Sequence, residues 1–127
     1  MYSELARHLS ERAEMGMRKY GTHLSFYNRR NPYIDAYQET LDLIMYLRQV
    51  IEETDVRYFV EVDYHVVQEP KPRPQPDRRR HVLTHVLSDL LLDDIGIHYI
   101  EHPFVSLYVD AIRMAEKFRL TIEGQKL

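Results

Sequence analysis

The chain has 127 residues, of which 44% are hydrophobic and 29% charged, a size and composition typical of one soluble globular domain. The formal net charge of −3 gives no general attraction to nucleic acid, so we expect no nucleic-acid partner. Because the sequence contains no cysteine, disulfides and thiolate sites are excluded, and any metal must bind through oxygen or imidazole.

The sequence gives no sign of a membrane span or a secretion signal. No stretch approaches the roughly 18 consecutive apolar residues of a transmembrane helix. The first residues, Met-Tyr-Ser-Glu, lack the basic and apolar regions of a signal peptide. We therefore expect a cytoplasmic protein without a membrane partner.

The first part of the sequence predicts two helices joined by a loop. Residues 2–20 place apolar side chains at helical spacing, and Gly21 is the left-handed stop expected after a helix. Asn31 followed by Pro32 is the pattern of an N-cap and a first helical residue, which predicts a second helix over 32–53. The loop between the helices contains one aromatic and two basic residues used below: Tyr27, Arg29 and Arg30.

The second part predicts one strand, a stiff connector and further elements. Apolar and polar residues alternate over 56–67, as in a half-buried strand. Prolines at every second position of 70–76 predict an extended connector. A third helix is expected over 78–94 and a last one over 104–120, with a short strand at 97–101.

These elements predict a mainly α fold, a helical bundle with a small additional β element. We expect a single domain over 1–127, in which residues 1–55 form the helical core. Residues 56–127 then supply the strand, the proline-rich connector and the two further helices.

The second predicted helix carries acidic residues in an otherwise apolar sequence. Asp35, Glu39 and Asp42 lie at i, i+4 and i+7 and share one stripe, while most other positions are apolar. A helix that is apolar over most of its circumference is expected to be buried inside a bundle, and burying carboxylates there is costly unless they are paired or bind a metal. Two interpretations follow: a metal site, or a structural salt bridge, for instance to Arg48.

Two acidic pairs have the same spacing, Glu11-x-x-Glu14 and Glu39-x-x-Asp42. If the two helices pair, four carboxylates converge, and these cannot all ionise without a counter-charge. Mg²⁺ meets this need, because it prefers oxygen ligands and is usually completed by water and substrate phosphates. The alternative is that Glu11 and Glu14, which lie opposite the apolar stripe of their helix, are solvated partners of nearby arginines, Arg7 and Arg18.

These residues resemble the motifs of the MazG-like all-α nucleoside triphosphate pyrophosphohydrolases. Residues 38–47 look like the family's second motif, E-x-x-D with an apolar continuation, and Glu11 and Glu14 occupy the place of the first. Lys19-Tyr-Gly21 resembles a turn of phage-type members. Position 10 departs from the first motif, since it is Ser10 rather than a further glutamate. The resemblance covers about residues 1–53.

The resemblance implies Mg²⁺-dependent hydrolysis of a nucleoside triphosphate to the monophosphate and pyrophosphate, in a homodimer or homotetramer. Glu11, Glu14, Glu39 and Asp42 would hold the metal, with Glu39 essential for catalysis and Glu14 accepting the proton of the attacking water. The phosphates would be neutralised by Lys19, Arg29 and Arg30, and Tyr27 would stack on the base. The alternative function is a non-catalytic nucleotide- or protein-binding module, a phage-type interaction factor, on the same helical core.

A second possible metal site is the stripe His81-x-x-x-His85-x-x-x-Asp89, whose side chains share one face of the third helix. Such a stripe can bind zinc or nickel. Because it lies opposite the leucine face of that helix, we expect its side chains to be solvent-exposed instead.

Overall fold

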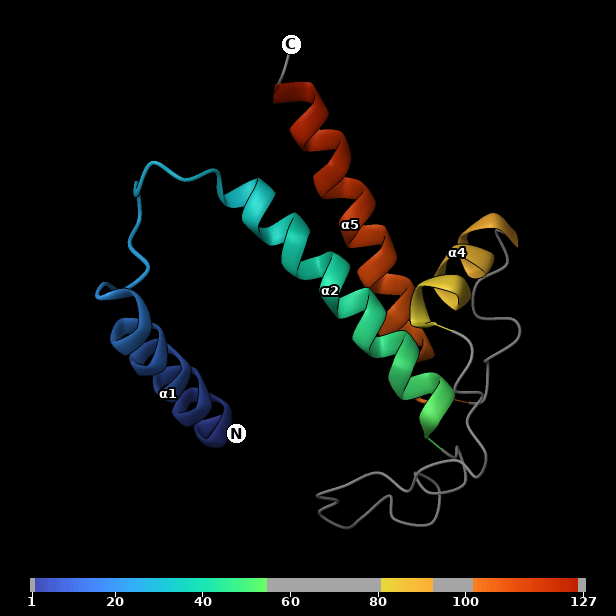
Figure 1. Ribbon diagram of the computed structural model, residues 1–127, viewed down its shortest axis with the longest axis horizontal. Helices are drawn as coiled ribbons and strands as arrows, with labels where there is room; N and C mark the ends of the chain where they lie inside the picture. The colour runs from blue at the N-terminus through green and yellow to red at the C-terminus, as the bar shows by residue number, and fades with distance from the viewer. Residues whose placement is uncertain (1, 55–80, 93–101, 126–127) are drawn as a thin grey trace. The chain divides into compact units, whose positions relative to one another are not determined.

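The computed structural model describes residues 2–54, 81–92 and 102–125, and these are mainly helical (Figure 1). The described residues form α1 Ser3–Tyr20, α2 Pro32–Glu53, α4 Val82–Leu92 and α5 Val105–Gln125. The prediction of a mainly α fold is confirmed. The predicted strands at 56–67 and 97–101 and the connector at 70–76 lie outside the described residues.

The chain divides into two compact units, Met1–Asn31 and Pro32–Leu127. The first unit contains α1 and the segment that follows it, and the second contains α2, α4 and α5. The single domain with a 1–55 core stays a prediction.

The first unit is an amphipathic helix with a defined stop. Gly21 has the left-handed φ of 75° and its N–H donates to the Met17 carbonyl oxygen at 2.8 Å, which confirms the predicted helix end. No residue of α1 is buried, so its apolar side chains, Leu5 and Leu9 among them, are exposed. An isolated helix of this length is marginally stable in water, because most helix stability comes from packing.

The second unit is built on α2, which packs against α5 and α4. α5 begins near the end of α2 and runs back along it (Figure 1). The small side chains of Ala111 and Ala115 on α5 leave room for the larger ones of α2. The core consists of seven buried residues: Ile44, Ile51, Val86, Val105, Tyr108, Ala111 and Ala115.

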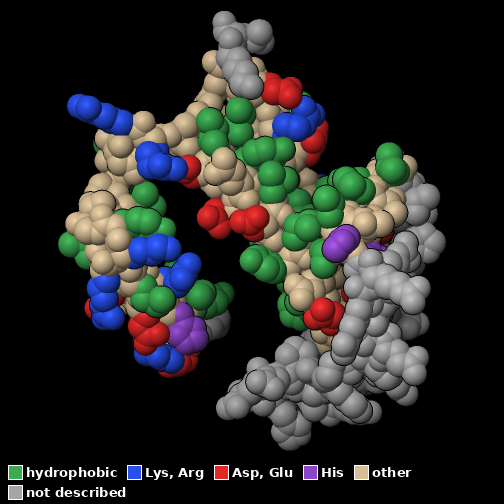
Figure 2. All heavy atoms as spheres, in the orientation of Figure 1, with side chains coloured by type: hydrophobic (Ala, Val, Ile, Leu, Met, Phe, Trp, Pro, Cys, Tyr) green, Lys and Arg blue, Asp and Glu red, His purple; other side chains and the backbone are tan. Residues whose placement is uncertain are grey.

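Only one stripe of α2 is buried, formed by Thr40, Ile44, Arg48 and Ile51. Leu43 and Tyr46 are 44% and 65% exposed, and Figure 2 shows hydrophobic side chains on the surface of this unit. The expectation that α2 is buried over most of its circumference is therefore wrong for the described residues. The physical reason is that α4 and α5 cover a single side of the helix.

Two helix boundaries differ from the prediction. The third helix begins at Val82 rather than 78, since His81 is not helical and its carbonyl oxygen accepts the Thr84 N–H at 3.1 Å. The last helix continues past 120 to Gln125. Arg119 supports this extension, because it pairs with the i−3 and i+4 carboxylates of the final turns, Glu116 and Glu123.

Candidate functional site

Glu39 and Asp42 lie one turn apart on an exposed face of α2. Among the described residues, neither carboxylate has an ion-pair or hydrogen-bond partner. Acidic residues at the end of the same helix do have partners, since Arg48 Nη1 lies 3.1 Å from Glu52 and Gln49 Nε2 lies 3.2 Å from Glu53. Like charges at this helical spacing repel each other, so the Glu39–Asp42 pair is a local surplus of negative charge that a cation would relieve.

The exposure of Glu39 and Asp42 corrects the expectation that apolar surroundings enclose them. The alternative of a salt bridge to Arg48 is also wrong, because the Arg48 guanidinium lies on the buried stripe and pairs with Asp89 and Glu52. An exposed carboxylate carries little desolvation cost. The pair therefore depends on no partner for its stability and is accessible to a ligand.

Glu11 and Glu14 lie in the first unit and are exposed and paired with arginines. Arg7 Nη1 lies 2.7 Å from Glu11, and Arg18 Nη2 lies 3.6 Å from Glu14. Hydrogen bonds to Glu4 and Glu11 hold the pKa of Arg7 above its ordinary value. These contacts match the alternative of solvated arginine partners. Since the two acidic pairs belong to different units, the four-carboxylate site stays a prediction.

The segment after α1 carries the predicted phosphate- and base-binding residues. Lys19 Nζ lies 5.2 Å above the ring of its neighbour Tyr20. Tyr27 and Arg29 both have left-handed backbones, with φ of 57° and 69°. Figure 2 shows Lys and Arg side chains protruding from this unit. The predicted binding residues of this unit are therefore on its surface.

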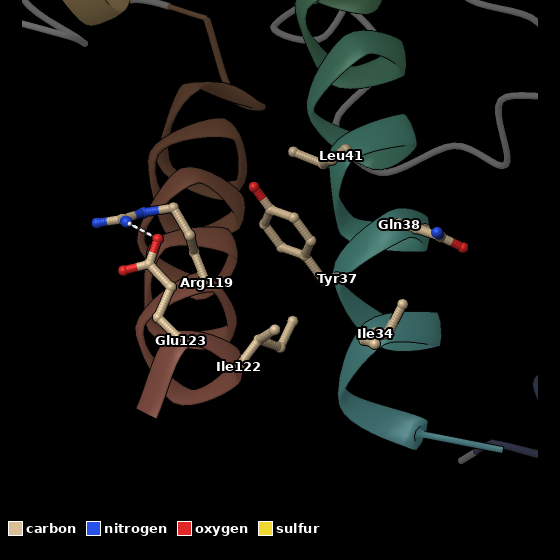
Figure 3. A pocket seen from close by; sticks show the side chains of 7 residues that line it. All are labelled: Ile34, Tyr37, Gln38, Leu41, Arg119, Ile122 and Glu123. Atoms are coloured by element: carbon tan, nitrogen blue, oxygen red, sulfur yellow. Dashed lines mark hydrogen bonds and ion pairs between the residues drawn. The ribbon is translucent and has the colours of Figure 1, made fainter. Parts of the chain in front are cut away.

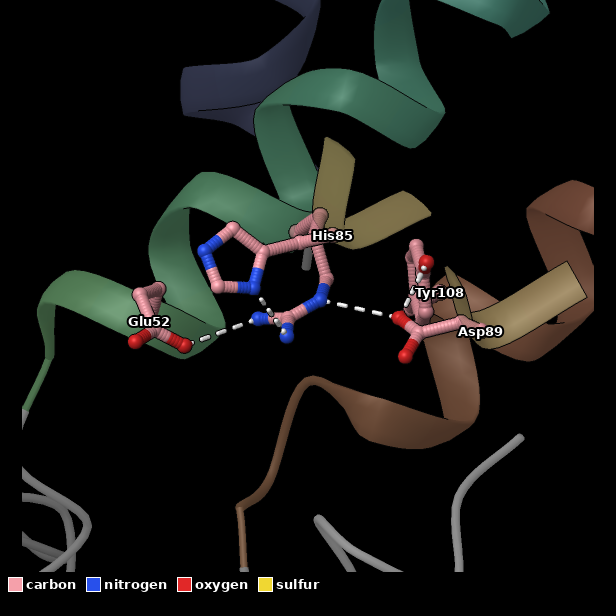
Figure 4. Close-up of polar contacts among 5 residues, drawn as sticks. Glu52, His85, Asp89 and Tyr108 are labelled. Atoms are coloured by element: carbon pink, nitrogen blue, oxygen red, sulfur yellow. Dashed lines mark hydrogen bonds and ion pairs between the residues drawn. The ribbon is translucent and has the colours of Figure 1, made fainter. Parts of the chain in front are cut away.

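Sequence reasoning missed a buried polar cluster centred on Arg48, whose side chain is 2% exposed. Its Nε donates to Asp89 Oδ2 at 2.9 Å, and its Nη2 lies 3.3 Å from His85 Nδ1 (Figure 4). The Tyr108 hydroxyl donates to the same Asp89 oxygen at 2.7 Å. Because arginine has no acceptor, His85 Nδ1 can take part in this contact only as the acceptor. The cluster joins α2, α4 and α5.

This cluster corrects the expectation that the stripe of His81, His85 and Asp89 is solvent-exposed. His81 is exposed, but His85 is half-buried and Asp89 is buried at 6% exposure. The sequence did contain an indication of this cluster. Arg48 lies four residues after Ile44, so on a helix its charge falls on the same apolar stripe. Such a position requires a buried counter-charge.

α2 and α5 also border an open groove of about 400 Å³. Figure 3 shows Tyr37 and Leu41 of α2 pointing toward α5, and Ile122 of α5 pointing toward α2. Arg119 also lines the groove, and its guanidinium is paired with the carboxylates of Glu116 and Glu123. The groove is lined mainly by apolar side chains, and Arg119 adds no uncompensated charge that would attract a phosphate.

Among the described residues, no three His, Asp or Glu side chains are grouped closely enough to hold a metal ion by themselves. None of the described helices is both long and apolar enough to cross a membrane. Comparison of the chain with protein-family models, with curated proteins and with solved structures finds no match.

Proposed function

We propose that the protein is a Mg²⁺-dependent nucleoside triphosphate pyrophosphohydrolase, which converts a (deoxy)nucleoside triphosphate to the monophosphate and pyrophosphate. The observation that carries this proposal is the Glu39–Asp42 pair, exposed and without a partner among the described residues. The proposal also draws on the resemblance of residues 1–53 to MazG-like enzymes.

The donor set of this pair fits magnesium. Two carboxylates one turn apart supply hard oxygen ligands, and Mg²⁺ usually retains several waters and binds substrate phosphates at its other positions. When bound, the ion would polarise a phosphate oxygen and make water more acidic. Glu39 and Asp42 would hold it together with one or both of Glu11 and Glu14, the further ligands that the motif spacing predicts.

The remaining roles belong to side chains of the first unit. A water attacks the α-phosphorus, the bond from that phosphorus to the α,β-bridging oxygen breaks, and pyrophosphate departs. Glu14, through a carboxylate oxygen that is not a metal ligand, accepts the proton of the water. Lys19, Arg29 and Arg30 neutralise the charge of the phosphates, and Tyr27 provides a ring face for the base.

A second candidate is a module that binds a nucleotide without hydrolysing it. The pairing of Glu11 with Arg7 and of Glu14 with Arg18 favours this candidate, because a carboxylate engaged by a guanidinium is a poorer metal ligand and base. Retained nucleotide binding without turnover would identify it.

Self-association as a homodimer or homotetramer is part of the proposal. It is supported by the exposed large apolar side chains of the second unit, because such surfaces commonly mark interfaces. Light scattering after size-exclusion chromatography measures the mass directly, and a monomer would contradict this part. The exposed residues concerned are Leu41, Leu43, Tyr46, Leu83, Leu87, Leu90 and Leu107.

The test is an assay of each ribo- and deoxyribonucleoside triphosphate with Mg²⁺ for monophosphate and pyrophosphate. Glu39→Gln should abolish turnover while circular dichroism stays unchanged, because the amide keeps the shape of the side chain and loses its charge. Glu53→Gln is the matched control, since Glu53 is an exposed acid of the same helix that contacts Gln49. Undiminished pyrophosphate release from Glu39→Gln would refute the proposal.

A further inference from the structure

The first unit contains a basic, acid-free segment within an acidic protein. No Asp or Glu occurs from Met15 to Asn31, although the whole chain has a formal net charge of −3. A cluster of basic side chains creates a local positive potential even when the net charge of the chain is negative, and that potential attracts anions. The segment is therefore suited to a polyanion. Its basic residues are Arg18, Lys19, Arg29 and Arg30.

Two aromatic side chains in this segment are almost entirely in water. Phe26 is 95% exposed and Tyr27 is 103% exposed, relative to a reference extended residue. Exposed apolar rings gain free energy when a ligand covers them. Since the rings are consecutive and lie between the two basic pairs, one ligand with both a planar apolar part and a charged part matches the segment.

The backbone around these rings is held in an uncommon conformation. Tyr27 and Arg29 are left-handed, which costs free energy for residues other than glycine. Asn28 fixes the turn, because its Oδ1 accepts the Arg30 N–H at 3.0 Å. A turn fixed in this way presents the Tyr27 ring and the Arg29 guanidinium with less entropy to lose on binding.

Three side chains of the segment that could contact the edge of a base are engaged within the segment itself. The Asn28 carboxamide oxygen accepts the Arg30 N–H, and the hydroxyls of Thr22 and Ser25 both donate to the His23 carbonyl oxygen, at 3.2 and 3.4 Å. The most exposed groups that the segment offers a ligand are its ring faces. Stacking on an exposed ring buries more apolar area for a purine than for a pyrimidine, and the gain in free energy scales with that area.

We propose that Phe26 and Tyr27 form a stacking platform that selects purine nucleoside triphosphates, adenine and guanine alike, over pyrimidine ones. The inference rests on the proposed function and names the substrate class of the same site. Phe26 is a specificity-determining residue in this proposal. The platform and the basic residues bind the nucleotide without a metal.

Binding is measured by isothermal titration calorimetry of the full chain with ATP, GTP, CTP and UTP in the presence of EDTA, which prevents turnover. ATP and GTP should bind similarly, and about five- to tenfold more tightly than CTP and UTP, because of their larger ring area. Phe26→Ala and Tyr27→Asn should each weaken ATP binding by about tenfold. Asn tolerates a left-handed backbone, so Tyr27→Asn removes the ring while sparing the turn.

Two further variants separate stacking from other effects. Tyr27→Phe keeps the ring and should bind ATP as the unaltered protein does. Leu24→Ala is the matched control, because Leu24 is 90% exposed in the same segment but has no ring, and it should leave ATP binding unchanged.

Equal affinity for purines and pyrimidines, or no nucleotide binding in EDTA, would overturn the inference. An equal loss in Leu24→Ala, or binding of anionic phospholipid vesicles that ATP does not displace, would also overturn it, since the segment would then be an apolar membrane-surface contact. The hydrolysis assay tests the proposed function independently of these binding measurements. Purine-selective binding without hydrolysis would refute the pyrophosphohydrolase and leave the stacking platform standing.

Discussion

Arg48 of α2 and Asp89 of α4 form a buried ion pair in which Arg48 Nε lies 2.9 Å from Asp89 Oδ2 and the side chains are 2% and 7% exposed. Two charges at this depth are stable only together, because each alone would be desolvated without compensation. The pair fixes α4 against α2, and the Tyr108 hydroxyl adds α5 to the same carboxylate.

Asp89→Asn should lower the free energy of unfolding by about 3 kcal/mol, because it removes the charge that compensates Arg48. Urea denaturation followed by circular dichroism measures the change. Asp110→Asn is the control, since Asp110 lies 3.8 Å from Arg113 and both side chains are mostly exposed. That substitution should cost less than about 1 kcal/mol. Equal costs for the two variants would show that burial does not set the strength of the Arg48–Asp89 pair.

Tyr108→Phe should cost about 1.5–3 kcal/mol, because it deletes the hydroxyl that donates to Asp89 at 2.7 Å and leaves the ring in place. Tyr108 is 0% exposed, so water cannot replace the lost donor. Tyr46→Phe, at a position 65% exposed, should change stability very little. Thermal denaturation measures the midpoint temperature of both variants. An unchanged midpoint for Tyr108→Phe would contradict a stabilising role of the hydroxyl.

Glu116 should titrate at lower pH than an ordinary glutamate, because the hydrogen bond from Arg119 holds its pKa down. A carboxylate with a depressed pKa stabilises the folded state above its unfolded pKa. That contribution is lost as the pH falls through the lowered pKa of the folded state. Carbon-13 NMR of the side-chain carboxyl follows the titration. Arg119→Gln should raise the pKa of Glu116, and an unmoved titration would exclude Arg119 as the cause.

Gly16→Ala and Gly21→Ala should have opposite effects on α1. An alanine side chain meets nothing within 4 Å at either position, so only the backbone decides. Gly16 lies inside the helix, where alanine is favoured by about 1 kcal/mol. Gly21 has a φ of 75°, where alanine costs about 1 kcal/mol. Amide hydrogen exchange of α1 should slow in the first variant and quicken in the second, and changes of the same sign would contradict the argument.

Some helix boundaries were predictable from the sequence, because neighbouring residues set them. Gly21 and the Asn31-Pro32 pair predicted the end of α1 and the start of α2. The extension of α5 to Gln125 was not predicted, although the Arg119–Glu123 pair that supports it has i, i+4 spacing and can be read from the sequence.

The candidate site was predictable only in part. The spacing of Glu39 and Asp42 placed them on one face of a helix, but whether that face is covered depends on the packing of distant segments. The same limit hid the Arg48 cluster, because Arg48 and Asp89 are 41 residues apart and no local pattern links them. Only the presence of a charge on the apolar stripe indicated that a partner exists.

The cluster around Arg48 also has a consequence for sequence variation. A buried guanidinium, the carboxylate beside it and the phenol that shares that carboxylate form a set in which each member is unfavourable without the others. Replacement at position 48 should therefore be accompanied by replacement at 89, and the hydroxyl at 108 should disappear with them. Correlated substitutions at these three positions in naturally occurring variants would be evidence that the three side chains are in contact.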